Sequence, residues 1–245
     1  MSFAPVTLAA RAPDAGLLLT CEHASPAVPA EYANLGLGPG QLRDHIGWDI
    51  GAATVTEELS RQLRAPAVLS AASRLLVDCN RDLPDHDLMP RESCGVAIPG
   101  NERIDDGDRA DRLQRFYTPF HAAVDAVARA NPNALLLSIH TFTPELHGQP
   151  RPFDVGVLFD AYDDLAGAFA ADIGAAGFGV RMNEPYSGLD GLIFSARRHG
   201  RQHGLRYLEL EINNRLLRRD DQAREVARRL VDAVARLLEA GSPAR

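Results

Sequence analysis

The sequence predicts a three-layer α/β fold, in which helices cover both faces of a mixed, mostly parallel central sheet. Short apolar runs of strand length alternate along the chain with longer stretches that carry apolar residues at helical spacing. One run, residues 134–139, is apolar on both faces, which is typical of a strand inside a parallel sheet. No internal repeat and no Ser/Gly linker divides the 245 residues, so we expect one domain over residues 1–245.

The first part of the chain contains three expected strands and one expected helix. Residues 17–21 form an apolar run after the turn residue Gly16. Residues 49–64 have apolar residues at helical spacing and end before Pro66, which predicts a helix. The next two apolar runs are expected as two strands or a hairpin around Ser73: residues 67–71 and 74–79.

The second part of the chain alternates helices and strands after a long loop. Residues 82–104 are rich in Pro, Gly and charge and have no periodicity, which predicts the loop. Acidic residues begin a helical pattern over residues 105–129, and Asn131-Pro132 closes it. After the strand at 134–139, the patterns predict in order a strand (155–159), a helix (162–176), a strand (206–212) and an amphipathic helix (220–240).

Composition and charge exclude several classes of function. The net charge is −7, and this acidic balance disfavours nucleic-acid binding, which needs clustered basic charge. The basic residues are all Arg, which excludes Schiff-base chemistry and a lysine-dependent phosphate loop. The apolar runs are too short for a membrane span, and we expect no targeting segment. Three cysteines without CxxC spacing fit no disulfide framework, so we expect a reducing cytoplasm.

Chemically capable residues follow four of the expected strands. In open α/β sheets, ligands bind beyond the carboxyl ends of the strands. Two His at separate strand ends, together with carboxylates, predict a divalent-metal site, with zinc and an activated water as the first candidates. No GxSxG motif points to a serine nucleophile. The four segments are Cys21-Glu22-His23-Ala24-Ser25, Asp78-Cys79-Asn80-Arg81-Asp82, His140-Thr141 and Glu211-Ile212-Asn213-Asn214.

Each of these residues also has a structural interpretation. A single His at a strand end is more often a hydrogen-bonded structural residue than a metal ligand. Glu211 could cap a helix, and Arg81 could form an ordinary surface salt bridge. His199 and His203 have the spacing of a metal-binding pair on one helix face, but their polar surroundings favour a solvated surface.

Five segments, taken in order, carry a family resemblance. They are Cys21-Glu22-His23-Ala24-Ser25 with Pro29, Asp44-His45-Ile46-Gly47-Trp48-Asp49-Ile50-Gly51-Ala52, Ser73-Arg74-Leu75-Leu76-Val77-Asp78-Cys79-Asn80-Arg81-Asp82, Ser138-Ile139-His140-Thr141-Phe142 and Leu210-Glu211-Ile212-Asn213. From about residue 16 to residue 217, they resemble the N-formylglutamate amidohydrolase family. This resemblance implies hydrolysis of an N-formyl amino acid, typically N-formylglutamate, to formate and the free amino acid in histidine breakdown.

The resemblance also implies a set of metal ligands. The family is similar in fold to zinc carboxypeptidases and aspartoacylases, which implies that His23 and His140 bind one zinc ion. Carboxypeptidases have a Glu three residues after the first His, where this chain has Pro26, so the third ligand must come from elsewhere. Asp44 is our choice, because it opens the Asp-His-Ile-Gly-Trp-Asp segment shared with the family. The alternatives are Glu22 and His45.

Further roles follow from the same resemblance. Asp78 matches an acid that orients a metal-bound His, and Asn80 with Arg81 matches the pair that holds the substrate carboxylate. Glu211 takes the place of the general base, and we expect Arg74 to help stabilise the oxyanion. Glu209, on the same strand face, is the alternative base. The candidates for binding a second substrate carboxylate are Arg91, Arg181 and Arg197.

The sequence leaves two other functions open. Cys21-Glu22 stands where many family members have Pro before the His, and this departure is compatible with a substrate other than formylglutamate. The chain could therefore hydrolyse another N-acyl amino acid or a small peptide. It could also be a non-catalytic protein that binds a metal or ligand with this fold. We expect a small-molecule partner, no nucleic acid and no membrane, and a homodimer contact through residues 220–240 is compatible with the pattern.

Overall fold

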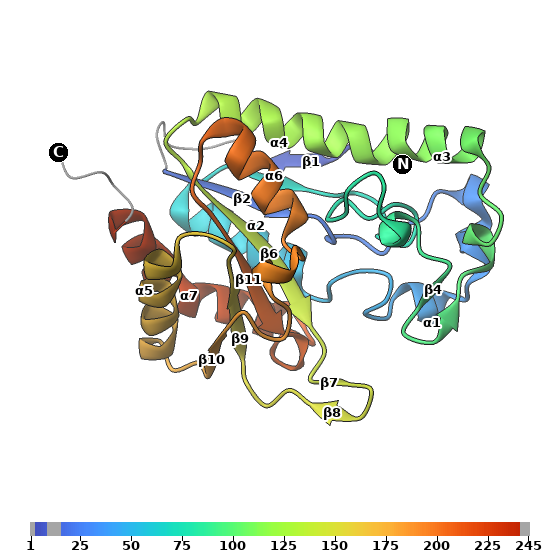
Figure 1. Cartoon of the computed structure of the whole chain (residues 1–245). Coiled ribbons are helices and arrows are strands. Elements are labelled where there is room, and N and C mark those ends of the chain that lie inside the picture. Colours follow the sequence, from blue (N-terminus) through green and yellow to red (C-terminus); the bar gives the residue numbers. More distant parts are fainter. Residues whose placement is uncertain (1–2, 9–15, 241–245) are drawn as a thin grey trace.

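The computed structural model describes residues 3–8 and 16–240, and a seven-stranded sheet forms its centre (Figure 1). In spatial order the strands are β1 (Val6–Leu8), β3 (Ala67–Leu69), β2 (Leu17–Cys21), β6 (Leu135–Phe142), β11 (Tyr207–Asn213), β9 (Val155–Leu158) and β10 (Val180–Met182). β3, β2, β6 and β11 are parallel. β1 is antiparallel to β3. β9 and β10 are parallel to each other, and β9 pairs with β11 in the antiparallel direction. The expected mixed, mostly parallel sheet is confirmed.

Helices cover both faces of this sheet, as expected. One face packs against α2 (Ala52–Leu63), α5 (Asp163–Ala175) and α7 (Asp220–Ala240). The other packs against α4 (Thr118–Ala130) and α6 (Phe194–His203). In Figure 1, α3 (Asp106–Arg112) and α4 form one long rod, joined by a π-helical turn at Leu113–Tyr117. The smaller elements are α1 (Pro39–Leu42) and two hairpins, β4 (Glu92–Ser93) with β5 (Val96–Ala97) and β7 (Glu145–Leu146) with β8 (Gln149–Pro150).

Most of the expected elements form, and two expectations are wrong. Residues 74–79 were expected as a strand but form turns, from which Leu75 and Leu76 are buried in the core. The second error concerns the surroundings of His199 and His203. They lie one turn apart on one helix, α6, as their spacing allows, but His199 is fully buried and not solvated. Helix α6 and the edge strands β1 and β10 have no counterpart among the expected elements. In the ranges described, no helix combines the length and apolar character that a membrane crossing requires.

The sheet face under α4 and α6 changes from apolar to charged toward the carboxyl ends of its parallel strands. Leu18, Leu136 and Tyr207 form the apolar half. Two strand registers place charged residues beyond them: Glu211 lies beside His140, and Glu209 lies beside Ser138. Charged groups are costly to bury unless they are paired or bind a cation, so this half of the face is where chemistry is expected. The buried polar residues there are Glu22, Ser138, His140, Glu209 and Glu211.

Gly200 lies where α6 approaches β11 most tightly. A Cβ atom at this position would lie 2.1 Å from Cδ1 of the buried Tyr207 ring. That ring has little freedom to move, because its hydroxyl donates a hydrogen bond to Asp160 at 2.7 Å. We expect Gly200→Ala to reduce the free energy of unfolding by about 1–3 kcal/mol, which lowers Tm by several degrees.

A matched glycine controls for helix propensity in this experiment. Gly167 lies within α5, and no atom would lie within 4 Å of a Cβ added there. Gly167→Ala is therefore expected to raise the free energy of unfolding by up to ~1 kcal/mol. Thermal unfolding of both variants measures the difference, and a Tm for Gly200→Ala equal to that of Gly167→Ala would contradict the close contact with Tyr207.

Candidate active site

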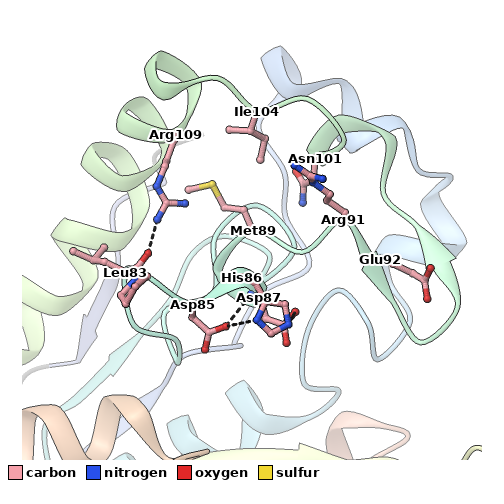
Figure 2. Close-up of a pocket in the computed structure, with 11 residues that line it drawn as sticks. Leu83, Asp85, His86, Asp87, Met89, Arg91, Glu92, Asn101, Ile104 and Arg109 are labelled. Atoms are coloured by element: carbon pink, nitrogen blue, oxygen red, sulfur yellow. Dashed lines mark hydrogen bonds and ion pairs between the residues drawn. The ribbon is translucent and has the colours of Figure 1, made fainter.

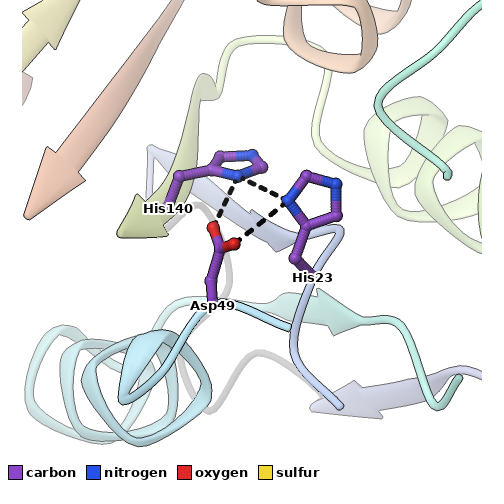
Figure 3. A group of neighbouring side chains, drawn as sticks. All are labelled: His23, Asp49 and His140. Atoms are coloured by element: carbon purple, nitrogen blue, oxygen red, sulfur yellow. Dashed lines mark hydrogen bonds and ion pairs between the residues drawn. The ribbon is translucent and has the colours of Figure 1, made fainter. Parts of the chain in front are cut away.

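Two histidines and an aspartate converge at the carboxyl ends of β2 and β6. His140 Nδ1 lies 3.1 Å from His23 Nδ1 and 3.0 Å from Asp49 Oδ2. His23 Nδ1 lies 3.4 Å from Asp49 Oδ1. All three side chains are buried. Figure 3 shows that each of the two rings points a nitrogen, Nδ1 in both cases, at the Asp49 carboxylate. Two imidazole nitrogens and a carboxylate oxygen at this separation are a donor set that fits a divalent metal such as zinc.

The local backbone brings Asp49 to the two histidines. The Asp49 amide donates a hydrogen bond to the His23 carbonyl at 2.9 Å, which ties the segment before α2 to the end of β2. The Asp49 carboxylate also accepts a hydrogen bond from the Thr141 amide, next to His140, at 3.0 Å. Gly51, the residue just before α2, has a φ of 85°, a left-handed conformation that favours glycine.

The outer nitrogen of each histidine is bound by a second carboxylate. His23 Nε2 donates to Asp78 at 2.7 Å, and His140 Nε2 donates to Glu22 at 3.1 Å. Burial opposes the charge on Glu22, but hydrogen bonds from His140 and Ser138 outweigh it and lower the pKa of Glu22 to about 2. Each carboxylate thus fixes its ring so that Nδ1 faces Asp49. Metal-binding histidines are commonly oriented in this way, by a carboxylate that accepts a hydrogen bond from the nitrogen that does not bind the metal.

The structure does not bring Asp44 to the two histidines. Its side chain is 61% exposed and accepts hydrogen bonds from the backbone and ring of His45 at 2.7 and 2.9 Å. Both residues lie in a turn in which the Asp44 carbonyl accepts from the Gly47 amide at 2.9 Å. Asp49, the second acid of the same segment, lies where Asp44 was expected. Glu22 accepts hydrogen bonds from Ser138 and from the outer nitrogen of His140, not from its Nδ1.

Two further carboxyl groups lie on β11 beside His140. Glu209 Oε2 lies 3.6 Å from His140 Nε2, and Glu211 belongs to the same close group. Burial raises the pKa of Glu209 to about 7 and that of Glu211 well above its usual value. One Glu211 oxygen, Oε2, is buried without a hydrogen-bond partner among the described residues. Glu211 is therefore a carboxyl group that can carry a proton beside the histidines.

Arg74 and Asp78 lie in the irregular segment between β3 and the long loop. Arg74 donates to Asp78 at 2.8 Å and also lies 3.5 Å from Asp49 Oδ1. Burial opposes the Arg74 charge, but Asp78 and Asp49 outweigh it and raise its pKa. The guanidinium thus links the acid that holds His23 to the acid that lies between the two histidines, and it stays charged.

Asn80 and Arg81 follow directly in the same segment. The Asn80 side chain is buried: its oxygen accepts from the Ser195 amide at 2.9 Å, and its nitrogen lies 3.4 Å from Glu209 Oε2. The Arg81 guanidinium is less constrained, with a hydrogen bond to the Asn80 carbonyl at 3.0 Å and Asp85 at 3.8 Å. Arg81 is therefore the more available cation for binding an anionic group.

These groups line one cavity of about 140 Å³. Six of the expected site residues line it, namely His23, Arg74, Asn80, Arg81, His140 and Glu211. Asp78 contacts His23 from outside the lining, and Asp44 lies elsewhere. Arg91, Arg181 and Arg197 are absent from this lining. Glu209, the alternative base, also lines the cavity, together with four residues to which sequence reasoning gave no role: Asp49, Thr141, Tyr186 and Leu192.

Tyr186 reaches the cavity because its segment crosses a strand closely. Gly156 on β9 pairs with Glu211, and a Cβ added to it would lie 2.0 Å from the Glu184 carbonyl oxygen. The backbone at Glu184 therefore lies directly over β9, and Tyr186 follows two residues later. Burial raises the pKa of the Tyr186 hydroxyl. No short-range pattern in the sequence marks Tyr186, because this crossing is a tertiary contact.

A larger cavity of about 680 Å³ lies in the loop that follows Arg81 (Figure 2). Arg91 lines it, together with Arg109, whose guanidinium donates to the Leu83 carbonyl. Its only group of metal-binding type among the described residues is Asp85-His86-Asp87, in which the His86 side chain is 90% exposed. Water screens such exposed groups, so the smaller cavity is the better candidate for catalysis.

Comparison with known proteins shows the family of this chain. A sequence model of the N-formylglutamate amidohydrolase family matches residues 15–218. The chain belongs to this family. Its members hydrolyse amide C–N bonds, so the chain is a hydrolase of this class, and the expected family resemblance is confirmed.

Solved structures that resemble this chain include one N-formylglutamate amidohydrolase. A gene product from Agrobacterium tumefaciens is 34% identical, with a TM-score of 0.91, and the match covers 97% of this chain and 95% of that chain. An N-formylglutamate amidohydrolase from Ralstonia eutropha JMP134 is 18% identical, with a TM-score of 0.71 and coverage of 97% and 98%. A metallo-carboxypeptidase from Burkholderia cenocepacia is 15% identical, with a TM-score of 0.44 and coverage of 97% and 61%. None of the curated proteins matches this chain.

Proposed function

We propose that this family member is a metal-dependent amidohydrolase that cleaves an N-formyl amino acid to formate and the free amino acid, with N-formyl-L-glutamate as the first candidate substrate. The observation that carries the proposal is the convergence of His23, Asp49 and His140 in a cavity that also contains Glu211. The family assignment supports the amide bond as the target.

His23, Asp49 and His140 would hold the metal ion, and two imidazoles with a carboxylate are a donor set typical of zinc or a similar divalent metal. When bound, such an ion polarises the substrate carbonyl and lowers the pKa of water toward ~7. Asp78 and Glu22 keep the two rings in place through their outer nitrogens. We assign no role in metal binding to Asp44.

Glu211 moves the proton in the proposed reaction. As a carboxylate it accepts a proton from the attacking water, and the protonated acid then donates to the nitrogen of the leaving amine. Burial raises its pKa, and a carboxyl group with a raised pKa holds the proton between these two steps. The buried position of Glu211 keeps bulk water from exchanging that proton first.

Arg81 and Asn80 would bind the substrate carboxylate beside these groups. A planar carboxylate matches the two-pronged guanidinium of Arg81, which lies 3.8 Å from one carboxylate, that of Asp85, whereas Arg74 lies 2.8 and 3.5 Å from two. Arg74 would stabilise the charge that develops on the carbonyl oxygen, in addition to its contacts with Asp78 and Asp49.

The lining of the cavity also favours a second candidate substrate. N-formylglutamate carries two carboxylates, yet Arg74 and Arg81 are the only arginines that line the cavity in the part of the chain described. Arg74 already pairs with Asp78. A formylated amino acid with a neutral side chain needs only Arg81 as its cation, so this alternative belongs in the same assay.

The test is release of the free amino acid, together with formate or acetate, by the purified protein from a panel of substrates. The panel contains N-formylglutamate, N-formylleucine and N-acetylglutamate. Comparing their rates of cleavage distinguishes the effect of the amino-acid side chain from the effect of the acyl group. We expect a formylated substrate to be cleaved, with activity lost after chelation and restored by zinc. Full activity after complete metal removal would contradict the metal-dependent scheme, and absence of cleavage across the panel would contradict the substrate class.

A further inference from the structure

A second group of titratable side chains lies between α4 and α6, outside the cavity described above. Asp125 Oδ1 lies 2.9 Å from His199 Nδ1 and 2.8 Å from His203 Nε2. One ligand atom from each residue lies within 4.8 Å of the other two. His199 is fully buried, whereas His203 and Asp125 are 10% and 17% exposed. The group is thus mostly dry but open to solvent on one side.

The helices hold these three side chains in place. His199 and His203 are one turn apart on α6, so they project from the same face of that helix. Asp125 comes from α4, which packs beside α6 on the same face of the sheet. Two imidazoles and one carboxylate are again brought together, now from helices rather than from strand ends.

A fourth residue fixes the buried ring. His199 Nε2 lies 2.8 Å from Nδ1 of His121, which is one turn before Asp125 on α4. His121 is itself buried, and its Nε2 has no hydrogen-bond partner among the described residues. A contact to the outer nitrogen is the arrangement that orients metal-binding histidines, so His199 is already held with Nδ1 toward Asp125.

We propose that Asp125, His199 and His203 form a second binding site for a divalent transition metal, zinc in the first place, which joins α6 to α4. Imidazole nitrogen and carboxylate oxygen are typical zinc ligands, and three of them leave a fourth position for water. The exposed edge formed by Asp125 and His203 lets an ion enter without unfolding of the chain. The site is independent of the proposed hydrolysis.

The experiment counts zinc per chain after the stripped protein is equilibrated with zinc and desalted. We expect two equivalents for the wild type, one for His203→Ala, one for His140→Ala and none for the double variant. Asp125→Asn, which keeps the size of the side chain, is expected to behave like His203→Ala. Zinc should also raise the Tm of His140→Ala but not that of the double variant.

The variants separate this proposal from the proposed function. Zinc content equal to the wild type in both His203→Ala and Asp125→Asn would overturn the second site. If the wild type and His140→Ala both hold one equivalent and His203→Ala holds none, the second site stands and the metal at His140 fails. His86→Ala is the matched control from the exposed Asp85-His86-Asp87 group and should keep both equivalents. Loss of one equivalent there, with none lost in His203→Ala, would assign the ion to that exposed group and overturn the proposal.

Discussion

Asp49→Asn is expected to weaken metal binding and hydrolysis by about 100-fold or more. Loss of an outer contact to a ligand commonly costs 10–100-fold in metal affinity, and Asp49 would contact the ion directly. The Asn side chain has the same size and can still accept the hydrogen bond from the Thr141 amide, so the fold should survive. Zinc content after desalting and the rate of formate release measure the two losses.

Asp44→Asn is the matched control for this prediction. It changes the other acid of the same short segment, whose exposed side chain accepts hydrogen bonds from His45. We expect zinc content and turnover close to the wild type. If Asp44→Asn loses the metal while Asp49→Asn retains it, the assignment of the third ligand is reversed, and the segment must rearrange when an ion binds.

Glu211→Gln is expected to lower turnover by about 10²–10⁴-fold while zinc content stays unchanged. Proton transfer by a positioned carboxyl group contributes about that much to a rate, and an amide cannot replace it. The buried carboxyl group has a raised pKa, so a neutral amide of the same size should be tolerated by the fold. Single-turnover formate release, with parallel zinc analysis, separates the loss of proton transfer from loss of the ion.

Glu209→Gln tests the alternative base on the same strand face. Glu209 lies near the Asn80 amide and His140 Nε2, and its change to Gln keeps an oxygen for the Asn80 contact. We expect a smaller loss of turnover than for Glu211→Gln. Near-normal turnover in Glu211→Gln combined with a large loss in Glu209→Gln would reassign the proton transfer to Glu209.

The sequence predicts the central strands because their side chains are buried on both faces. The runs at 17–21 and 134–139 lie inside the sheet, where each backbone group pairs with a neighbouring strand. The run at 74–79 contains three apolar residues in a row, at 75–77, but other partners bind its backbone. The Leu75 carbonyl accepts a hydrogen bond from the side-chain amide of Asn101 at 2.8 Å. The Leu76 carbonyl accepts one from the Arg112 guanidinium at 3.2 Å. Such partners, 26 and 36 residues away, are not visible in a local pattern.

Helix α6 was missed for a related reason. Its residues are mostly polar and lack the apolar stripe that marks a buried helix, so they were interpreted as solvated. Asp125 and His121 compensate for the burial of His199 by hydrogen bonding. Hydrogen bonds between α6 and α4 therefore stabilise this helix where an apolar face would otherwise be expected. A single sequence does not reveal which distant residue supplies such a hydrogen-bond partner.

The candidate site shows the same limit at a finer scale. Strand ends identified His23, His140 and Glu211, because parallel strands bring their carboxyl ends together. Asp49 was not among the expected third ligands, which were Asp44, Glu22 and His45, because its place beside the histidines depends on a turn of a few residues. One backbone hydrogen bond, from the Asp49 amide to the His23 carbonyl, decides which acid faces the histidines.

The glycine beside Glu211 limits how the cavity can be redesigned for bulkier acyl groups. Any side chain at position 156 would push the Glu184 carbonyl outward, and Tyr186 with it. Mutagenesis at that position would thus alter the wall of the cavity and the surroundings of Glu211 in a single change. Thr141 and Leu192, which line the cavity from other segments, are the better starting points for engineered variants with altered selectivity.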